Sequence, residues 1–168
     1  MSKPRVAVVF GSDSDWAVME KCVAQLREFG ESPYVEAVSA HRSPDRVATF
    51  AKDAEANGLD VIIAAAGMSN ALAGAVAAHT CLPVIGVPLA SGSLQGFDAL
   101  LSTVQMPPGI PVATVSVGEA GAKNAALLAI QILARKDPRL AEAYRKFKSD
   151  QADAVTARNK KLQEKLGP

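Results

Sequence analysis

The segment Val38-Ser39-Ala40-His41-Arg42-Ser43-Pro44-Asp45 carries the side chains of this chain best suited to chemistry. It sets one of only two histidines beside an arginine, after an apolar run and before a helix start. An imidazole can exchange protons near neutral pH, and a guanidinium can hold a phosphate or carboxylate through two parallel hydrogen bonds. Ligands of parallel α/β sheets bind at such strand-to-helix junctions. The segment therefore predicts a proton-transfer site with an anion-binding group; the alternative is a plain loop with a solvated arginine.

A second candidate loop, Phe10 to Trp16, places a glycine before small hydroxylated and acidic residues at a helix start. Free backbone N–H groups and the positive end of a helix dipole favour anions there. Ser12 or Ser14 can add a hydroxyl donor, and Asp15 can accept hydrogen bonds from sugar hydroxyls. The alternative is ordinary capping of the helix by these same residues.

Two further loops follow the next apolar runs. Residues 64–74 are mostly small, which lets a planar ligand approach the backbone closely, and Ser69 or Asn70 can cap the following helix. The alternative is a tightly packed turn between a strand and a helix. The polar loop from Ala90 to Gly96 either closes over a site or merely connects two elements. We expect the ligand contacts, for one small phosphorylated molecule, to come from Ser12, Asp15, Ser39, Ala40, Arg42, Ala66, Gly67, Ser69, Asn70 and Leu72.

Short β-branched runs alternate with helix-length segments along most of the chain, which predicts a parallel sheet built from right-handed βαβ units. The expected strands are 5–10, 34–38, 61–65, 84–87 and 112–115, and the expected helices are 15–29, 45–56, 70–79, 96–103 and 123–134. The strands are continuous apolar runs, as expected when both faces are covered. The fold class is therefore α/β, a three-layer α/β/α sandwich with a parallel, flavodoxin-like sheet and an extra C-terminal helix.

The tail differs from the rest of the chain. Leu140, Tyr144, Phe147 and Val155 recur at helical spacing among charged residues, which predicts an amphipathic helix. We expect residues 1–136 to form the catalytic α/β domain and residues 137–168 to form this helix. It either packs on its own domain or lies across a neighbouring protomer, and we favour the second because an exposed apolar stripe is costly.

The composition argues against several classes of function. The formal net charge of +1 and an aromatic content of 5% give no electrostatic or stacking surface for nucleic acid. No apolar run is long enough to span a bilayer, and Met1 to Arg5 leads directly into a strand without a signal peptide. Cys22 and Cys81 are expected to be reduced thiols, in a cytoplasmic protein. No cluster of metal-ligand spacing is present, so no metal is expected.

The sequence resembles the carboxyaminoimidazole ribonucleotide mutase family of purine biosynthesis, also described as the catalytic subunit of phosphoribosylaminoimidazole carboxylase. The resemblance runs from about Val6 to Ala134. Its matching blocks are Gly11-Ser12-Asp13-Ser14-Asp15-Trp16, Ser39-Ala40-His41-Arg42-Ser43-Pro44-Asp45, Gly86-Val87-Pro88, Val104-Gln105-Met106-Pro107, Gly109-Ile110-Pro111-Val112 and Asn124-Ala125-Ala126-Leu127-Leu128-Ala129. Several blocks in the same order make the resemblance specific.

The resemblance implies a cofactor-free isomerase that moves a carboxylate from an exocyclic nitrogen to a ring carbon of an aminoimidazole ribonucleotide. It implies that His41 is the general acid and base, acting through trapped carbon dioxide, and that Ser12, Asp15 and Arg42 contact the substrate. It also implies a homo-octamer, which agrees with a C-terminal helix that lies between protomers. Nucleic acid and membrane are not among the expected partners.

One block departs from the family pattern. Mutases carry Gly-Gly-Ala-Ala-His-Leu-Pro-Gly where this chain has Gly67-Met68-Ser69-Asn70-Ala71-Leu72-Ala73-Gly74. A second branch, which carboxylates aminoimidazole ribonucleotide directly with carbon dioxide, has Gly-Arg-Ser-Asn at this point. Because Met68 supplies no charge, we favour the mutase over this carboxylase. A flavodoxin-like nucleotide-binding domain is the further alternative.

Overall fold

The computed structural model describes residues 3–167, and its centre is a five-stranded parallel sheet. The strands are β1 (Val6–Phe10), β2 (Tyr34–Ala37), β3 (Val61–Gly67), β4 (Val84–Leu89) and β5 (Ala113–Thr114). They lie in the order β2-β1-β3-β4-β5. The chain adds β2 on one side of β1, then crosses back and adds β3, β4 and β5 on the other side. This order confirms the expected flavodoxin-like sheet, and the reversal between β1 and β3 is where such sheets bind ligands.

Burial explains the strand sequences. Every residue of β1 and β4 is buried, as are the first five residues of β3, because helices cover both faces of the sheet. The edge strand β2 instead leaves Tyr34 and Val35 exposed. The other edge strand, β5, is shorter than the expected 112–115 and pairs only with Ile85 and Gly86 of β4. Pro107, Pro108 and Pro111 precede β5, and proline has no N–H to extend a strand ladder.

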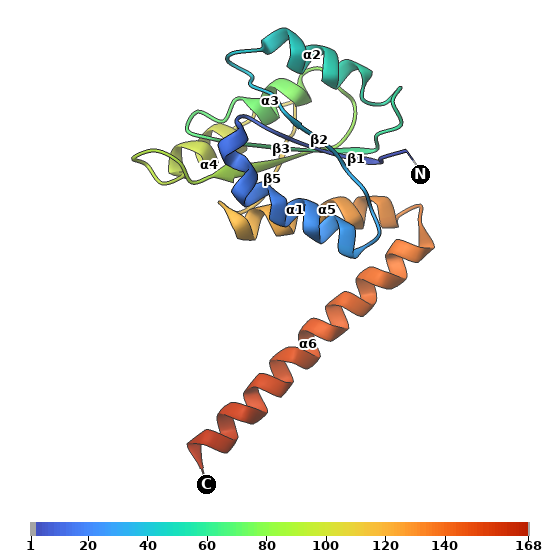
Figure 1. The fold of residues 1–168 in the computed structure, drawn as a ribbon, viewed down its shortest axis with the longest axis vertical. Coiled ribbons are helices and arrows are strands. Elements are labelled where there is room, and N and C mark those ends of the chain that lie inside the picture. The colour runs from blue at the N-terminus through green and yellow to red at the C-terminus, as the bar shows by residue number, and fades with distance from the viewer. Residues whose placement is uncertain (1–2, 168) are drawn as a thin grey trace. The chain divides into compact units, whose positions relative to one another are not determined.

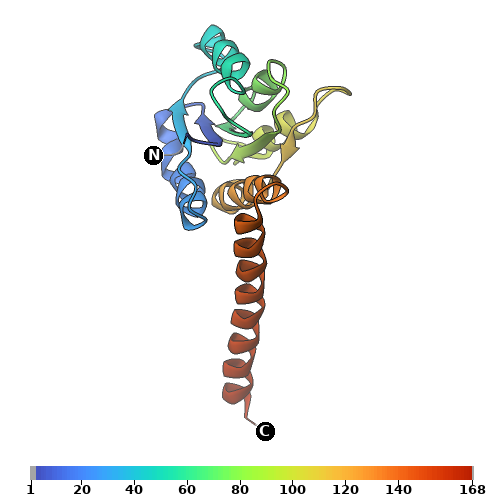
Figure 2. The same cartoon turned by 90° about the vertical axis from the view of Figure 1, so that its right-hand side faces the viewer.

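Helices form the two outer layers (Figures 1 and 2). In Figure 1, α2 (Pro44–Asp53), α3 (Leu72–Ala77) and α4 (Phe97–Val104) lie on one face of the sheet. The other face is covered by α1 (Trp16–Glu28) and by α5 (Glu119–Ala134) as far as Ala129. A short 3-10 helix, η1 (Asp13–Asp15), leads into α1. The expected three-layer α/β/α architecture is confirmed, with helix ends that differ by a few residues.

Two glycines lie in the turns that follow helices. Gly30 and Gly58 follow α1 and α2 with φ of 80° and 90°, the left-handed conformation that glycine adopts without strain. Gly86 serves a different purpose, since a Cβ there would collide with Thr103 of α4. Glycine at this position therefore allows α4 to approach β4 closely.

The core lies on both faces of the sheet. Between the sheet and the α2–α3 layer, Val9, Ile62, Val47, Phe50 and Leu72 pack in one buried cluster. On the opposite face the fully buried side chains are Met19, Cys22, Leu26, Ile63 and Ile85. These packed layers hold the strand ends, and therefore the loops that follow them, in fixed positions.

The chain divides into two compact units, residues up to Ala129 and residues from Ile130. The division falls inside α5 rather than at Asp137, the boundary that the sequence suggests. The second unit contains α6 (Pro138–Leu166), whose N-cap Asp137 accepts hydrogen bonds from the backbone of Arg139 and Leu140. No helix between residues 3 and 167 is both long and apolar enough to cross a bilayer. Residues 1, 2 and 168 of the expected segments lie outside the described residues.

Candidate active site

A cavity of about 420 Å³ opens at the carboxyl ends of the strands, at the point where the strand order reverses. Loops after β1, β2, β3 and β4 all contribute to its wall. The lining residues are Gly11, Ser12, Ser14, Asp15, Ser39, Ala40, His41, Arg42, Ala66, Gly67, Met68, Ser69, Ala71, Leu72 and Ser91. The structure therefore brings together His41 and every residue that the sequence suggests as a ligand contact, with the exception of Asn70.

The loop after β1 is folded by its own carboxylates. Asp15 Oδ2 accepts from Ser12 N at 3.0 Å, and Asp13 Oδ1 accepts from Ser14 N at 3.0 Å. Gly11 N donates to Ala65 O, and Asp15 N donates to Ser12 O. Four backbone N–H groups of this loop are therefore satisfied within the chain, so the expected cradle of free N–H groups for an anion is wrong. The capping role, which the sequence left as the alternative, is the one observed.

Asp15 is a titratable group of the cavity whose pKa is changed by its surroundings. Burial raises the pKa of the Asp15 carboxyl, and the backbone hydrogen bond from Ser12 opposes this rise. One of its oxygens accepts the N–H of Ser12. A half-buried carboxylate of this kind can accept hydrogen bonds from the hydroxyl groups of a ligand.

The loop after β2 is braced by two serines. Ser43 Oγ donates to Ser39 O at 3.0 Å and accepts from Ser39 N at 3.1 Å. Ser43 therefore does not cap α2 with its side chain, although Pro44 occupies the first turn of that helix. Ser39 Oγ accepts from both Arg42 N and Arg42 Nε, at 3.2 and 3.4 Å. Ser39 thereby helps to set the direction of the Arg42 guanidinium, while its own hydroxyl proton stays available to a ligand.

His41 stands at the exposed tip of this braced loop. Its side chain lines the cavity and makes no hydrogen bond to another residue in the range 3–167. An imidazole in this position can take up or release a proton at a bound molecule without first breaking a contact within the chain.

The loop after β3 forms another side of the cavity. Ala66, Gly67, Ser69 and Leu72 lie on the wall, as expected. A Cβ on Gly67 would collide with Ser91, so glycine here lets the loop after β4 close against β3. Met68, with φ of 54°, is in the left-handed region that costs energy for any residue other than glycine.

Asn70 is the one predicted contact that does not lie on the wall. It is 1% exposed, and its amide nitrogen donates to Thr103 Oγ1 at 2.9 Å and to Val87 O at 3.4 Å. Neither Ser69 nor Asn70 caps α3, whose N-cap is Ala71 without a side-chain hydrogen bond. The sequence could not show this, because an asparagine in a loop is equally suited to a ligand, a cap or a buried contact.

Five wall residues are not among the expected contacts: Gly11, Ser14, Met68, Ala71 and Ser91. Ser91 follows β4, the strand beside β3, so the shared edge of a parallel sheet is a signal that could have found it. Its position favours the interpretation of residues 90–96 as a loop that closes over the site. The sequence marks Met68 and Ala71 only as departures from the family pattern.

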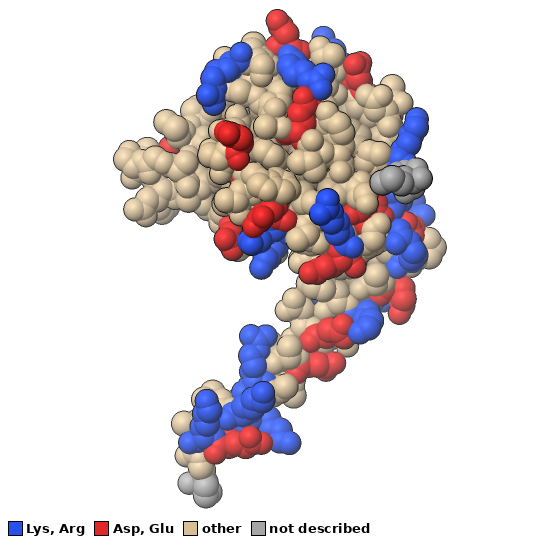
Figure 3. All heavy atoms as spheres, viewed as in Figure 1, with Lys and Arg blue, Asp and Glu red and all other residues tan. Residues whose placement is uncertain are grey.

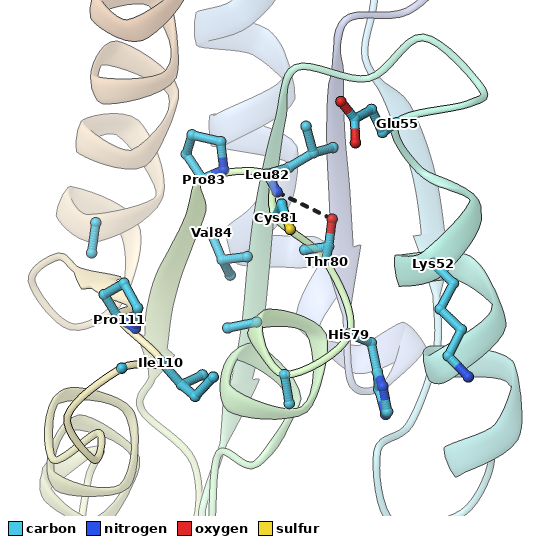
Figure 4. A pocket seen from close by; sticks show the side chains of 14 residues that line it. Lys52, Glu55, His79, Thr80, Cys81, Leu82, Pro83, Val84, Ile110 and Pro111 are labelled. Carbon is cyan, nitrogen blue, oxygen red and sulfur yellow. Dashed lines mark hydrogen bonds between the residues drawn. The ribbon is translucent and has the colours of Figure 1, made fainter.

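The remaining reactive side chains lie elsewhere. Burial raises the pKa of the Cys22 thiol to about 12, so this cysteine stays protonated and unreactive. His79 and Cys81 line a separate hollow at the amino ends of β4 and β5 (Figure 4). Among residues 3–167, no three His, Cys, Asp or Glu side chains are grouped so that they could hold a metal ion.

Taken together, the cavity offers one free imidazole, one guanidinium, several hydroxyls, a half-buried carboxylate and a wall of small residues. Hydroxyls and a guanidinium can hold a phosphate, a carboxylate suits sugar hydroxyls, and small residues leave room for a flat ring. The imidazole is the group suited to proton transfer at that ring.

Comparison with known proteins points the same way. Residues 5–154 match the model of a family described as AIR carboxylase. The chain is 50% identical, over 98% of its length and 94% of the relative's, to the N5-carboxyaminoimidazole ribonucleotide mutase of Mycobacterium tuberculosis strain CDC 1551. It is 52% identical to the enzyme of the same name from Escherichia coli K12, over 90% and 89% of the two chains.

A solved structure agrees with this comparison in three dimensions. The crystal structure of Treponema denticola PurE superposes with a TM-score of 0.85 at 34% identity, covering 95% of this chain and 99% of that one. The match gives no support to a flavodoxin-like nucleotide-binding domain of another family. The chain belongs to the AIR carboxylase family.

Proposed function

We propose that this protein is an N5-carboxyaminoimidazole ribonucleotide mutase, an isomerase of purine biosynthesis. The observation that carries the proposal is the cavity at the strand reversal, where His41, Arg42 and the serine hydroxyls meet in a chain 50% identical to mutases of this name. The substrate is a small ribonucleotide, which matches a cavity of about 420 Å³ lined by hydroxyls and a guanidinium.

Each part of the ribonucleotide has a chemically suitable group in the cavity. Arg42, oriented by Ser39, is the partner for the phosphate. Ser12 is a further donor once its hydroxyl turns from Asp13 Oδ1 toward the phosphate. Asp15 accepts hydrogen bonds from the ribose hydroxyls. The small-residue wall, which includes Ala66 and Gly67, faces the imidazole ring of the substrate.

His41 supplies the proton chemistry in this proposal. Its imidazolium protonates the carbamate nitrogen as the N–C bond breaks, which leaves carbon dioxide and aminoimidazole ribonucleotide in the cavity. The ring carbon then attacks carbon dioxide, forming the C–C bond, and the neutral imidazole removes the proton of that ring carbon to restore aromaticity. One histidine suffices because the first step produces the base that the second step needs.

The proposed mutase and the alternative carboxylase differ in the molecule that donates the carboxyl group. Relatives named as mutases align over nearly the whole chain at about 50% identity. Met68 lines the cavity without a charge, so the chain lacks the arginine that the resemblance associates with direct carboxylation. Both observations favour a substrate that already carries its carboxyl group.

The deciding experiment compares two substrates with the purified protein in the absence of ATP. We expect rapid conversion of the carboxyamino ribonucleotide and slow conversion of aminoimidazole ribonucleotide, even at high bicarbonate. Efficient use of aminoimidazole ribonucleotide at low bicarbonate, with no turnover of the carboxyamino compound, would show a carboxylase instead. Failure with both would contradict the proposed function.

We further propose that the protein works as a homo-oligomer, the octamer that the resemblance implies. Exposed apolar side chains of α4 and its preceding loop support this, since Leu94, Phe97, Leu101 and Val104 recur at helical spacing. Phe97 is 72% exposed, which is unusual for a phenylalanine without a partner surface. Figure 3 shows this end of the first unit almost free of charged residues, while both signs mix over the rest of that face.

The second unit also carries exposed apolar side chains, on α6. Leu140 is fully buried within the chain, so it is not available to a partner, contrary to the expected stripe. Val155, Leu162 and Leu166 are the large exposed apolar residues of α6, and Leu162 and Leu166 lie about two and three helical turns after Val155. Deletion of residues from Gln151 onward should therefore yield smaller assemblies by light scattering. An assembly of unchanged mass would contradict a role of α6 between protomers.

A further inference from the structure

Asn70 interrupts the cavity wall. Every other residue from Ala66 to Leu72 lines the cavity, while the Asn70 side chain is buried between the loop, β4 and α4. Its backbone joins the same contact, because Asn70 N donates to Ser102 Oγ of α4 at 2.9 Å. One residue thus ties the wall to the helix behind it at two points.

The hydrogen-bond pattern fixes the orientation of the Asn70 amide. Thr103 Oγ1 gives its proton to Ala99 O at 2.6 Å, so this oxygen can only accept from Asn70. The second partner, Val87 O, is a backbone carbonyl and also can only accept. Both acceptors therefore require the nitrogen of the amide, and no rotation of the amide group satisfies them with its oxygen.

The amide oxygen of Asn70 makes no comparable contact in the described part of the chain. Asn70 Oδ1 is buried and has no hydrogen-bond partner within residues 3–167. A buried acceptor without a partner is a cost that an apolar side chain would avoid. The two bonds donated by the amide nitrogen are therefore the polar contacts that hold the Asn70 side chain.

The loop that Asn70 holds is tightly bent. Asn70 N lies 3.0 Å from Met68 O, and Ala71 N lies 2.7 Å from Ser69 O, so two short turns follow one another. Met68 is in the left-handed region. Backbone in such conformations persists only where the surrounding structure holds it.

We propose that Asn70 is a positioning residue for the reaction: its amide, anchored on Thr103 and Val87, holds residues 68–71 as the wall that orients the substrate ring toward His41. The expected change in kcat rests on the proposed function, whereas the expected loosening of residues 68–71 rests on the hydrogen bonds alone. It replaces the expected contact between Asn70 and the substrate.

The test uses Asn70→Leu in the full chain, because leucine keeps the branched shape and loses both donors. Since misplacement of a substrate-orienting group lowers the rate of the chemical step, we expect kcat to fall by about tenfold or more. KM should change by less than about threefold, because the phosphate and ribose contacts remain. The backbone amides of Asn70 and Ala71 should exchange with solvent deuterium faster than in the parent protein. Asn70→Ala serves as the second variant if leucine prevents folding.

A double-mutant cycle separates positioning from general destabilisation. Thr103→Val removes the acceptor while keeping the methyl group beside Gly86, and the matched control is Thr114→Val on β5, whose hydroxyl donates to Val112 O. Because the Asn70 and Thr103 variants break the same bond, the double variant should lose about as much kcat as the worse single one. Thr114→Val should keep the kcat of the parent protein.

Two results would overturn the proposal. One is an unchanged kcat per folded molecule in Asn70→Leu, with only thermal stability reduced, and the other is full additivity of the Asn70 and Thr103 effects. If the parent protein turns over no carboxyamino ribonucleotide, the proposed function fails first. The deuterium exchange of Asn70 and Ala71 then still decides whether the side chain holds the loop.

Discussion

The sheet carries a hollow at each end of its strands, and the larger of the two is not the one that gathers the groups suited to catalysis. At the amino ends of β4 and β5, the hollow in Figure 4 measures about 970 Å³ and contains the second histidine, His79. Most of its lining is aliphatic or backbone, including Leu82, Pro83, Val84, Ile110 and Pro111. Its charged groups, Lys52 and Glu55, come from α2 and the segment after it and lie apart in Figure 4.

The smaller hollow at the carboxyl ends, of about 420 Å³, gathers polar groups from four successive strand ends. Parallel strands and right-handed crossovers bring those loops to one edge, where the strand order reverses. Volume alone would select the amino-end hollow. The difference teaches that the topology of the sheet, and not the size of a cavity, locates the side chains that can work together.

The largest expected effect is that of replacing His41 with asparagine, and the same replacement at His79 is its matched control. His41→Asn keeps a hydrogen-bonding side chain but cannot transfer a proton, so kcat should fall by at least about 100-fold. His79→Asn, at the amino ends, should leave kcat within about twofold of the parent protein. Steady-state kinetics with the carboxyamino ribonucleotide measures both. A His41 variant that keeps more than about a tenth of the activity would contradict the mechanism.

The next effect concerns binding. Arg42→Ala removes the guanidinium proposed for the phosphate and should raise KM by the equivalent of about 2–3 kcal/mol, with a smaller change in kcat. Lys52→Ala removes a positive charge from the amino-end hollow and is the matched control, which should not change KM. If Arg42→Ala lowers only kcat, the guanidinium acts in the chemical step and not in binding the phosphate.

Much of the fold and of the carboxyl-end cavity could be predicted from the sequence. The continuous apolar runs predict the buried parallel strands, and the rule that their carboxyl ends share an edge places Ser12, His41 and Ser69 together. Side-chain periodicity also predicts α6 as a helix, although it could not show that Leu140 is buried within the chain.

What the sequence could not predict are choices among hydrogen-bond partners. Ser43 bonds to Ser39 instead of capping α2, and Asn70 turns away from the cavity toward Thr103. In the loop after β1, the carboxylates of Asp13 and Asp15 take the N–H groups that an anion would need. Each of these side chains has several acceptable local partners, and only the packing of distant elements decides between them.

The backbone strain beside the cavity gives a third, smaller prediction. Met68 has a φ of 54° at the carboxyl ends, whereas the hollow at the amino ends places a glycine, Gly109, at its own positive φ of 99°. Met68→Gly should therefore stabilise the fold by up to about 1 kcal/mol in urea denaturation. Met68→Ala is the matched control, because it removes the long side chain as well but keeps the Cβ. Equal stability of the two variants would show that the backbone at residue 68 is not strained.

The smallest expected effect is that of Asp15→Asn. This variant tests whether a polar group of the carboxyl-end cavity lowers the stability of the fold. Burial raises the pKa of Asp15 in the folded chain above its ordinary value of 3.8, so the folded state favours the neutral carboxyl. The contribution of Asp15 to the free energy of unfolding is then greatest at low pH. It declines as the pH rises from the unfolded pKa through the folded one.

At neutral pH the ionised Asp15 therefore costs stability, and asparagine, which can still accept the N–H of Ser12, avoids that cost. We expect Asp15→Asn to be more stable than the parent protein at about pH 7, with the difference shrinking as the pH falls below the folded pKa. Activity should fall, since the amide is a weaker acceptor for ribose hydroxyls than a carboxylate. Asp53→Asn, exposed at the end of α2, controls for the loss of one negative charge. Urea denaturation at several pH values measures the difference, and a variant less stable at pH 7 than at acid pH, relative to the parent, would show that hydrogen bonding outweighs burial at Asp15.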